Sequence, residues 1–191
     1  MAEQTNTVTT AGKPKVRVWA LVVLAVVAVC VYAADRVSKF FVVRDLPQGV
    51  PVDVLGEFLR FTYVLNPGAA FSIGSGTTWI FAILASAVVV FIVFFARRIR
   101  SVAWAIFVGL LLGGTLGNLT DRLFNEPGFA IGHVIDFIQV WMFPAIFNVA
   151  DIGIVSAMGL FIILTIRGIG LDGVRVVRTK DSVEPASTET S

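Results

Sequence analysis

Four long, mostly apolar runs divide the chain, at residues 18–34, 77–96, 101–120 and 143–166. They contain 17 to 24 residues each, and an α-helix needs roughly 20 to cross the hydrocarbon core of a bilayer. Only the fourth run contains a charged side chain, Asp151. The pattern predicts an all-α membrane protein, a bundle of four transmembrane helices.

The first run has a second interpretation. A basic start, a short apolar stretch and small residues such as Ala33 and Ala34 are also typical of a secretory signal peptide. The three apolar runs that follow favour a chain embedded in the membrane throughout.

Basic residues beside the runs predict the orientation. With the N-terminus inside, the inner segments hold ten of the fifteen basic residues, and the outer segments hold Arg36, Lys39, Arg44, Arg60 and Arg122. Cytoplasmic segments carry the excess of Lys and Arg, so both ends should lie inside. We therefore expect a cytoplasmic tail at 1–17, one membrane domain at 18–166, and a disordered cytoplasmic tail at 167–191.

Two segments are expected outside. Within 35–76, residues 50–55 and 59–64 alternate between apolar and polar and are rich in β-branched types. This predicts two or three short strands, a small β-cradle within about 44–70 at the outer surface. The other segment, 121–142, is short and mixes charged with apolar residues.

Composition excludes several classes of protein. With 57% hydrophobic and only 15% charged residues, the chain departs from soluble domains in both directions. One Cys and one His cannot form a disulfide or the usual structural zinc site. No HExxH or P-loop spacing occurs, and a net charge of +2 does not suggest nucleic acid. We expect no metal or cofactor, and we expect Cys30 to serve packing.

Asp151 is the strongest candidate for chemistry, because an ionisable group inside a span is costly. Counting places it about two turns into the fourth helix, with Asn148 on the same helical face. Asp136, in a re-entering segment at 131–140, is its best partner. Two carboxylates in a low-dielectric site retain a proton between them and supply an acid and a base, which suits peptide hydrolysis. A purely structural role for Asp151 stays open.

The remaining polar residues favour structural interpretations. Asp121 and Arg122 at a helix end indicate an ion-pair and capping cluster, with Asn118 on the same helix. Asn66-Pro67-Gly68 is typical of a turn and could also hold an extended peptide.

Serine chemistries are weaker hypotheses. A Ser–Lys dyad would use Ser38 and Lys39, but snorkelling explains Lys39 more simply. A Ser–His pair would use Ser75 and His133, yet the G-x-S-x-G elbow is absent. A hydrogen-bonding or surface role suits His133 better.

Five short motifs occur in order along residues 18–166. Together they resemble lipoprotein signal peptidase, the bacterial type II signal peptidase, an aspartic protease of the membrane. The motifs are the Asp after the first span and four words of sequence: Asp35, Asn66–Phe71, Gly117–Arg122, Val134–Phe137 and Phe147–Asp151.

The resemblance implies a four-helix membrane bundle with an extracytoplasmic β-cradle, and a catalytic pair at Asp136 and Asp151. It also implies residues that shape the site or hold substrate: Asp35, Asn66, Gly68, Asn118, Asp121, Arg122, Phe147 and Asn148. One departure is residues 123–128, a stretch longer than in shorter family members.

The implied substrate is a prolipoprotein whose cysteine carries diacylglycerol, cut just before that cysteine by an activated water. The resemblance places the protein in the bacterial cytoplasmic membrane, in contact with membrane lipid, with the site near the extracytoplasmic face. A monomer suffices.

Two alternatives stay open. A small proton-coupled transporter would use Asp151 as a relay, although the inner halves of the spans lack charges. A non-catalytic membrane scaffold would tolerate Asp→Asn substitutions.

Overall fold

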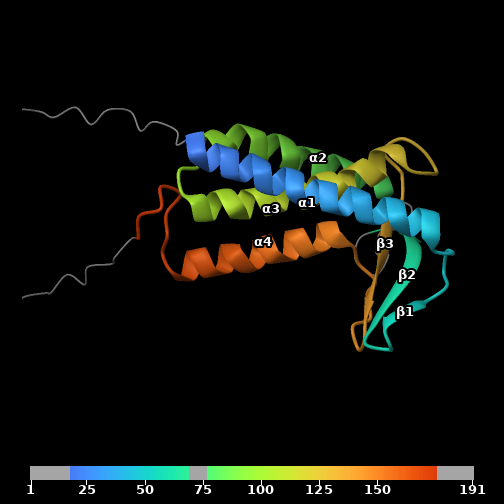
Figure 1. The fold of residues 1–191 in the computed structure, drawn as a ribbon. Helices are drawn as coiled ribbons and strands as arrows, with labels where there is room; N and C mark the ends of the chain where they lie inside the picture. The colour runs from blue at the N-terminus through green and yellow to red at the C-terminus, as the bar shows by residue number, and fades with distance from the viewer. Residues whose placement is uncertain (1–17, 69–76, 176–191) are drawn as a thin grey trace, which may run out of the picture.

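The computed structural model describes residues 18–68 and 77–175. Four long helices and three strands follow one another along the chain (Figure 1): α1 (Val18–Asp45), β1 (Val52–Leu55), β2 (Leu59–Asn66), α2 (Thr78–Phe95), the 3₁₀ turn η2 (Ala96–Arg98), α3 (Val102–Phe124), β3 (Val134–Val140) and α4 (Val149–Ile166). The predicted N-terminal tail, most of the predicted C-terminal tail, and Ser75 lie outside the described residues.

The prediction of a four-helix bundle with a small sheet is confirmed. All four helices are long and apolar enough to cross a membrane. Helix α1 continues well past the predicted span, so residues 35–45 are helical. Helix α4 begins at Val149 because Asn148 caps it. Asp151 therefore lies in the first turn of α4 and not, as counting suggested, about two turns in.

The sheet takes one strand from outside the predicted cradle. Its order is β1-β2-β3, with antiparallel pairing throughout. The third strand, β3, comes from the segment that we expected only to re-enter the bundle. Its residues Val134–Val140 are mostly apolar, and they pair with the edge of β2 that β1 leaves open. This pairing anchors the segment that carries Asp136 to the cradle.

Helix α3 is the centre of the bundle, because its glycines admit two neighbours at close range. A Cβ atom added at Gly113 would lie 2.6 Å from the carbonyl oxygen of Ala28 on α1. One added at Gly114 would lie 2.4 Å from the carbonyl oxygen of Ala150 on α4. Small residues let helix backbones approach closely in membranes, so α1 and α4 meet α3 on adjacent faces near the site.

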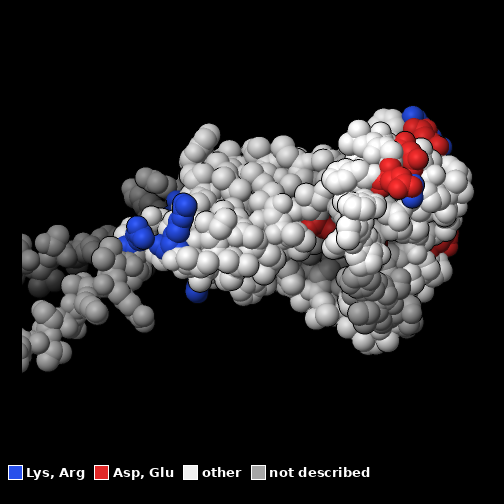
Figure 2. Space-filling model, turned by 90° about the horizontal axis from the view of Figure 1, so that it is seen from below, with Lys and Arg blue, Asp and Glu red and all other residues white. Residues whose placement is uncertain are grey.

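The two ends of the bundle differ in charge. Helix α1 begins and α4 ends at one end, which we call the basic end, and the sheet lies at the other, the sheet end (Figure 1). Figure 2 shows basic side chains at the basic end and most of the visible acidic ones toward the sheet end. The basic end carries Arg97, Arg98, Arg100, Arg167 and Arg175. The direction in which the bundle crosses the membrane stays a prediction.

Each end of the bundle contains an apolar cluster. One joins α1, α2 and α3 at the basic end around Leu24, Ile92 and Val108. The other packs Val42 of α1 against Ile135 and Phe137 of β3. The second cluster fixes the sheet against the end of α1, and with it the position of the polar residues between them.

Candidate active site

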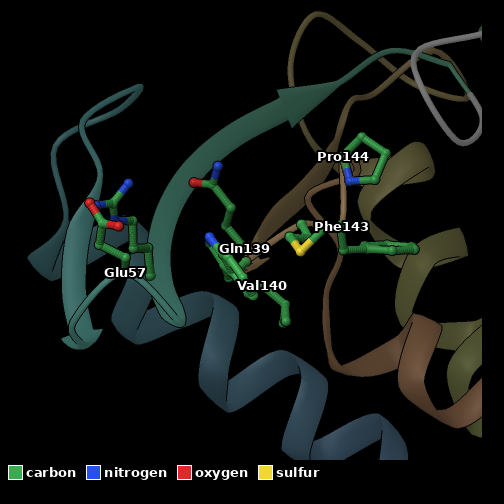
Figure 3. A pocket seen from close by; sticks show the side chains of 8 residues that line it. Glu57, Gln139, Val140, Phe143 and Pro144 are labelled. Carbon is green, nitrogen blue, oxygen red and sulfur yellow. The ribbon is translucent and has the colours of Figure 1, made fainter.

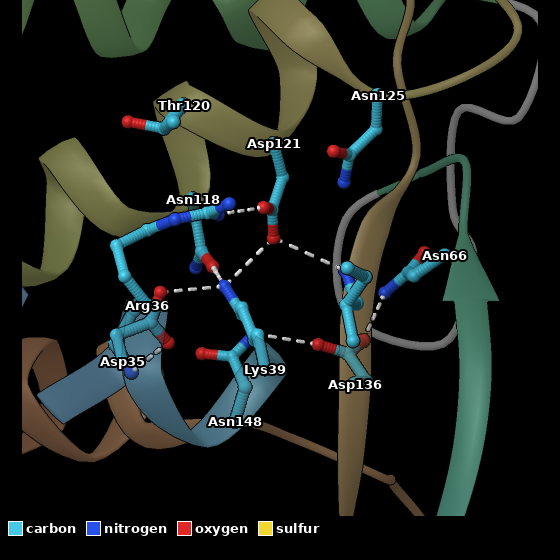
Figure 4. A network of polar contacts seen from close by, with 12 residues as sticks. Asp35, Arg36, Lys39, Asn66, Asn118, Thr120, Asp121, Asn125, Asp136 and Asn148 are labelled. Atoms are coloured by element: carbon cyan, nitrogen blue, oxygen red, sulfur yellow. Dashed lines mark hydrogen bonds and ion pairs between the residues drawn. The ribbon is translucent and has the colours of Figure 1, made fainter. Parts of the chain in front are cut away.

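Strand pairing brings Asn66 to Asp136. In the register of β2 and β3, Asn66 faces Val134 and Val64 faces Asp136. Asn66 and Asp136 are therefore diagonal neighbours on one face of the sheet. Asn66 Nδ2 donates a hydrogen bond to Asp136 Oδ2 at 2.9 Å, and Asn66 Oδ1 accepts one from the Gly68 N–H at 3.0 Å. The predicted turn at Asn66 thus also orients the amide toward the carboxylate (Figure 4).

The segment before α4 is attached to the other edge of β3. The backbone of Phe147 pairs with Ile138, with its N–H donating to the Ile138 carbonyl at 3.1 Å. Asn148 follows and caps α4: its side chain accepts from the Asp151 N–H, while Asp151 Oδ2 accepts from the Asn148 N–H. The same Asn148 side chain donates to Asp136 Oδ1 at 2.6 Å. One residue therefore contacts both predicted catalytic aspartates.

Asn118 on α3 completes this arrangement. Its Nδ2 donates to Asp151 Oδ1 at 2.8 Å, and its Oδ1 accepts from Asn148 Nδ2 at 3.1 Å. Three carboxamides from three distant segments thus hold two carboxylates. The sequence motifs containing Asn66, Asn118 and Asn148 were expected to shape the site, and the structure brings them together.

A buried ionic cluster lies behind these amides. The Lys39 ammonium is 1% exposed and lies 2.8 Å from Asp35 Oδ2 and 2.7 Å from Asp121 Oδ2. Arg36 also pairs with Asp121. The snorkelling interpretation of Lys39 is wrong, because the turn of α1 that carries it faces α3 and not the interface. Asp121 belongs to an ion-pair cluster as predicted, but its partners are on α1 and Arg122 is not among them.

Asp35 and Asp121 also fix backbone positions. Asp35 Oδ1 accepts from the Ala150 N–H at 3.0 Å, at the start of α4. Asp121 Oδ2 accepts from the Ile135 N–H at 3.2 Å, next to Asp136. The cluster therefore connects α1 to both elements that carry the aspartates.

One cavity is lined by both aspartates together with Asn66 and Asn118. Its volume is about 600 Å³. The wall contains Asp136 and Asp151, and most of the remainder is apolar: Phe81 on α2, Val134 on β3, Phe143, Ile146 and Phe147 before α4, and Ile152 and Val155 on α4. Such a space suits a mainly apolar ligand with a polar reacting centre.

Arg122 and Gly68 form part of the same wall. Arg122 Nη2 donates to the Gly68 carbonyl at 2.6 Å, and the guanidinium lies over the ring of Phe81, 5.1 Å from its centre. Within the described residues, Arg122 Nη1 is buried without a hydrogen-bond partner. A buried donor of this kind favours a ligand that brings an acceptor.

Burial raises the pKa of Asp136 to about 6. The carboxyl is 3% exposed, and loss of water disfavours its charged form. Hydrogen bonds from Asn66 and Asn148 act in the opposite direction, while the negative charge of Asp151 raises the pKa of Asp136 further. The Asp136 carboxyl therefore retains its proton to a higher pH than an ordinary aspartate does.

A second cavity lies away from the aspartates. It has a volume of about 320 Å³ and lies against the outer part of the sheet, where Glu57, Gln139, Val140, Phe143 and Pro144 line it (Figure 3). Phe143 borders both cavities. This second cavity lacks a carboxylate pair, so we assign no chemistry to it.

The structure also bears on the sequence hypotheses about Ser38, His133, Cys30 and a metal site. The Ser38 hydroxyl donates to the carbonyl of Asp35 and not to Lys39, so the Ser–Lys dyad is wrong. His133 does not line the large cavity. Cys30 is exposed on the outside of α1, so it does not pack in the core as expected. Among the described residues, no three His, Cys, Asp or Glu side chains come together as a metal site requires.

These features define a class: a multi-pass membrane protein with a carboxylate-lined cavity at one end of a four-helix bundle. Comparison with known proteins gives the family. The chain belongs to the signal peptidase (SPase) II family, whose model matches residues 27–167.

Curated relatives agree with this assignment. The chain is 61% identical over 164 residues to a lipoprotein signal peptidase of Leifsonia xyli subsp. xyli, covering 86% of this chain and 76% of the relative. It is 45% identical over 148 residues to the protein of the same name from Mycobacterium tuberculosis, covering 78% and 73%. The shared name supports the resemblance predicted from the motifs.

Solved structures have the same fold. A bacterial membrane enzyme determined by the in meso method at 2.3 Å resolution superposes with a TM-score of 0.70 and 28% identity, covering 86% of this chain and 98% of the other. A second, at 1.9 Å resolution, gives a TM-score of 0.67 and 29% identity over 80% of this chain and 96% of the other.

Proposed function

We propose that this protein is an aspartic endopeptidase that removes signal peptides from diacylglyceryl-modified prolipoproteins. The observation that carries the proposal is the juxtaposition of Asp136 and Asp151, from β3 and α4, in the wall of one cavity. The names of the curated relatives support the substrate class. The cut falls just before the lipidated cysteine.

The two aspartates divide the chemistry. Asp136 keeps the shared proton, because burial and the neighbouring charge of Asp151 raise its pKa. Asp151 takes a proton from a water molecule, whose oxygen attacks the scissile carbonyl carbon. Asp136 donates its proton to the carbonyl oxygen, which gives a tetrahedral gem-diol intermediate. As the C–N bond breaks, Asp151 passes the proton taken from water to the leaving nitrogen, and one hydroxyl of the intermediate returns a proton to Asp136. No covalent intermediate with the enzyme and no metal ion is needed.

The carboxamides keep this pair in place. Asn66, Asn118 and Asn148 donate to the carboxylates through amide groups that do not titrate. A fixed geometry of this kind reduces the loss of entropy on reaching the transition state. Arg122 Nη1, the buried donor in the wall, is available to a carbonyl of the bound peptide.

The apolar wall suits a substrate held by the membrane. Val155 of α4 lines the cavity and is 69% exposed. Acyl chains and the signal-peptide helix can therefore remain in lipid while the scissile bond reaches the aspartates. We place the sheet end at the extracytoplasmic face of the bacterial cytoplasmic membrane, with both termini inside, because the opposite end carries the basic residues. A monomer contains the complete site.

The test is cleavage of a synthetic diacylglyceryl-cysteine prolipoprotein by the purified protein in lipid. Asp136→Asn and Asp151→Asn should each abolish cleavage while remaining monodisperse and folded. Asp53→Asn is the matched control, because Asp53 is an exposed residue of β1 outside the cavity, and it should cleave normally. Full activity of either cavity variant would refute the aspartic mechanism, and an inactive, folded wild type would refute the function.

A further inference from the structure

We propose that Lys39 is a positioning residue for the reaction: as an obligate donor it fixes the orientation of the Asn118 and Asn148 amides, and through them both aspartates. The inference rests on the proposed function and extends it to a residue on α1 that does not line the cavity. Figure 4 shows Lys39 between the ionic cluster and the amides.

The Lys39 ammonium lies among three oxygen atoms. It forms ion pairs with Asp35 Oδ2 at 2.8 Å and Asp121 Oδ2 at 2.7 Å, and it donates a hydrogen bond to Asn118 Oδ1 at 3.1 Å. An ammonium group has three donors and no acceptor. The side-chain atom of Asn118 that faces Lys39 must therefore be its oxygen.

This fixes the direction of every later hydrogen bond. With its oxygen toward Lys39, Asn118 must present its NH₂ group to Asp151 Oδ1, at 2.8 Å. The Asn118 oxygen also accepts from Asn148 Nδ2, and that NH₂ group donates to Asp136 Oδ1. An amide can otherwise turn over at small cost, and the reversed amide would aim an oxygen at a carboxylate.

The competing interpretation is that Lys39 only neutralises Asp35 and Asp121. Arg36 allows the two to be separated. It carries the same charge and belongs to the same cluster, where it pairs with Asp121. Arg36→Gln is therefore the matched control for Lys39→Met: each removes one positive charge, but only the second removes the donor to Asn118.

The kinetic expectations follow from misplacement of the aspartates. Lys39→Met should lower kcat about 100-fold with little change in KM, the usual scale for a displaced catalytic group. Arg36→Gln should stay within about threefold of wild type, and Lys39→Arg, which keeps a donor-only cation, should recover part of the loss. Equal decreases in kcat for Lys39→Met and Arg36→Gln would show that Lys39 acts only through its charge, and would refute the positioning role.

A double-mutant cycle tests the route. If Lys39 acts through Asn118, Lys39→Met should cost nothing further in an Asn118→Ala background. Additive losses would overturn the proposal. If Lys39→Met does not accumulate in folded form, the double variant Lys39→Met/Asp35→Asn removes one positive and one negative charge and so preserves the net charge of the cluster. Its activity is then compared with that of Asp35→Asn alone, with and without Asn118→Ala.

A measurement without substrate separates this inference from the proposed function. Six groups surround Lys39 or the carboxylate it influences: Asp35 and Arg36 on α1, Asp121 and Arg122 on α3, Asp136 on β3 and Asp151 on α4. Carbon-13 NMR of labelled aspartate, assigned with Asp136→Asn, should give a higher pKa for Asp136 in Lys39→Met and an unchanged one in Arg36→Gln. An unchanged pKa in Lys39→Met would count against Lys39 even if wild type cleaves nothing. If wild type cleaves the substrate and the losses in the double-mutant cycle are additive, the positioning role of Lys39 is refuted while the proposed function stands.

Discussion

Replacing Asp136 with asparagine should stabilise the folded protein at neutral pH while it removes activity. Burial raises the pKa of Asp136 from 3.8 to about 6. Each pH unit between the unfolded and folded pKa values corresponds to about 1.4 kcal/mol, so the ionised carboxylate costs the folded state about 3 kcal/mol. Asparagine does not ionise and does not carry this cost.

The sign follows from the direction of the pKa change. The unfolded chain releases the Asp136 proton near pH 4, and the folded chain holds it until about pH 6. The cost is therefore absent below pH 4, grows as the pH rises, and is complete above about pH 6. Asparagine also loses one acceptor for Asn66 or Asn148, at about 1–2 kcal/mol independent of pH.

The expected result is a crossover. Asp136→Asn should be less stable than wild type by about 1–2 kcal/mol at pH 4 and more stable by about 1–2 kcal/mol at pH 7. Unfolding in mixed micelles, followed by tryptophan fluorescence at several pH values, gives the difference. Asp53→Asn, at an exposed position of β1 outside the cavity, is the control. A difference that does not change with pH would refute the assignment of the buried proton to Asp136.

Two further predictions concern pH and packing. The value of kcat/KM should fall as the pH rises through about 6, because the free enzyme then loses the Asp136 proton. The value of kcat should fall only at higher pH, because bound substrate excludes water and raises the pKa of Asp136 further. Identical pH profiles for kcat/KM and kcat would contradict this effect of bound substrate. Gly114→Ala should lower the free energy of unfolding by about 1–3 kcal/mol and reduce cleavage, because the new Cβ would meet the Ala150 carbonyl. Gly159→Ala, where a Cβ meets nothing within 4 Å, should be neutral or slightly stabilising in the same unfolding assay, and a loss equal to that of Gly114→Ala would refute the packing argument.

The fold was largely predictable because its strongest signal is local. Apolar runs of membrane-spanning length can be counted directly, and period-2 alternation indicated strands β1 and β2. Strand β3 was missed because its apolar residues suit a buried helix or a buried strand equally well. Its pairing with β2 depends on an edge contributed by residues about seventy positions away.

The site was predictable in its members but not in its connections. A carboxylate inside an apolar run identified Asp151, and the motifs identified its neighbours. Lys39 was misinterpreted, because a lysine near the end of a span usually reaches toward water. Only the length of α1 showed otherwise: the helix continues to Asp45 and turns Lys39 toward Asp121 of α3. A possible signal was the spacing of Asp35 and Lys39, which are four apart and form an ion pair along the helix.

Asn148 gives the site a mechanical property of its own. The side chain that caps α4 is also the one that reaches across to Asp136. Fraying of the first turn of α4 would remove the Asn148 hydrogen bonds to Asp136 and to Asp151 at the same moment. Local unfolding of this helix end would thus inactivate the site at a temperature at which the remainder of the bundle is still folded.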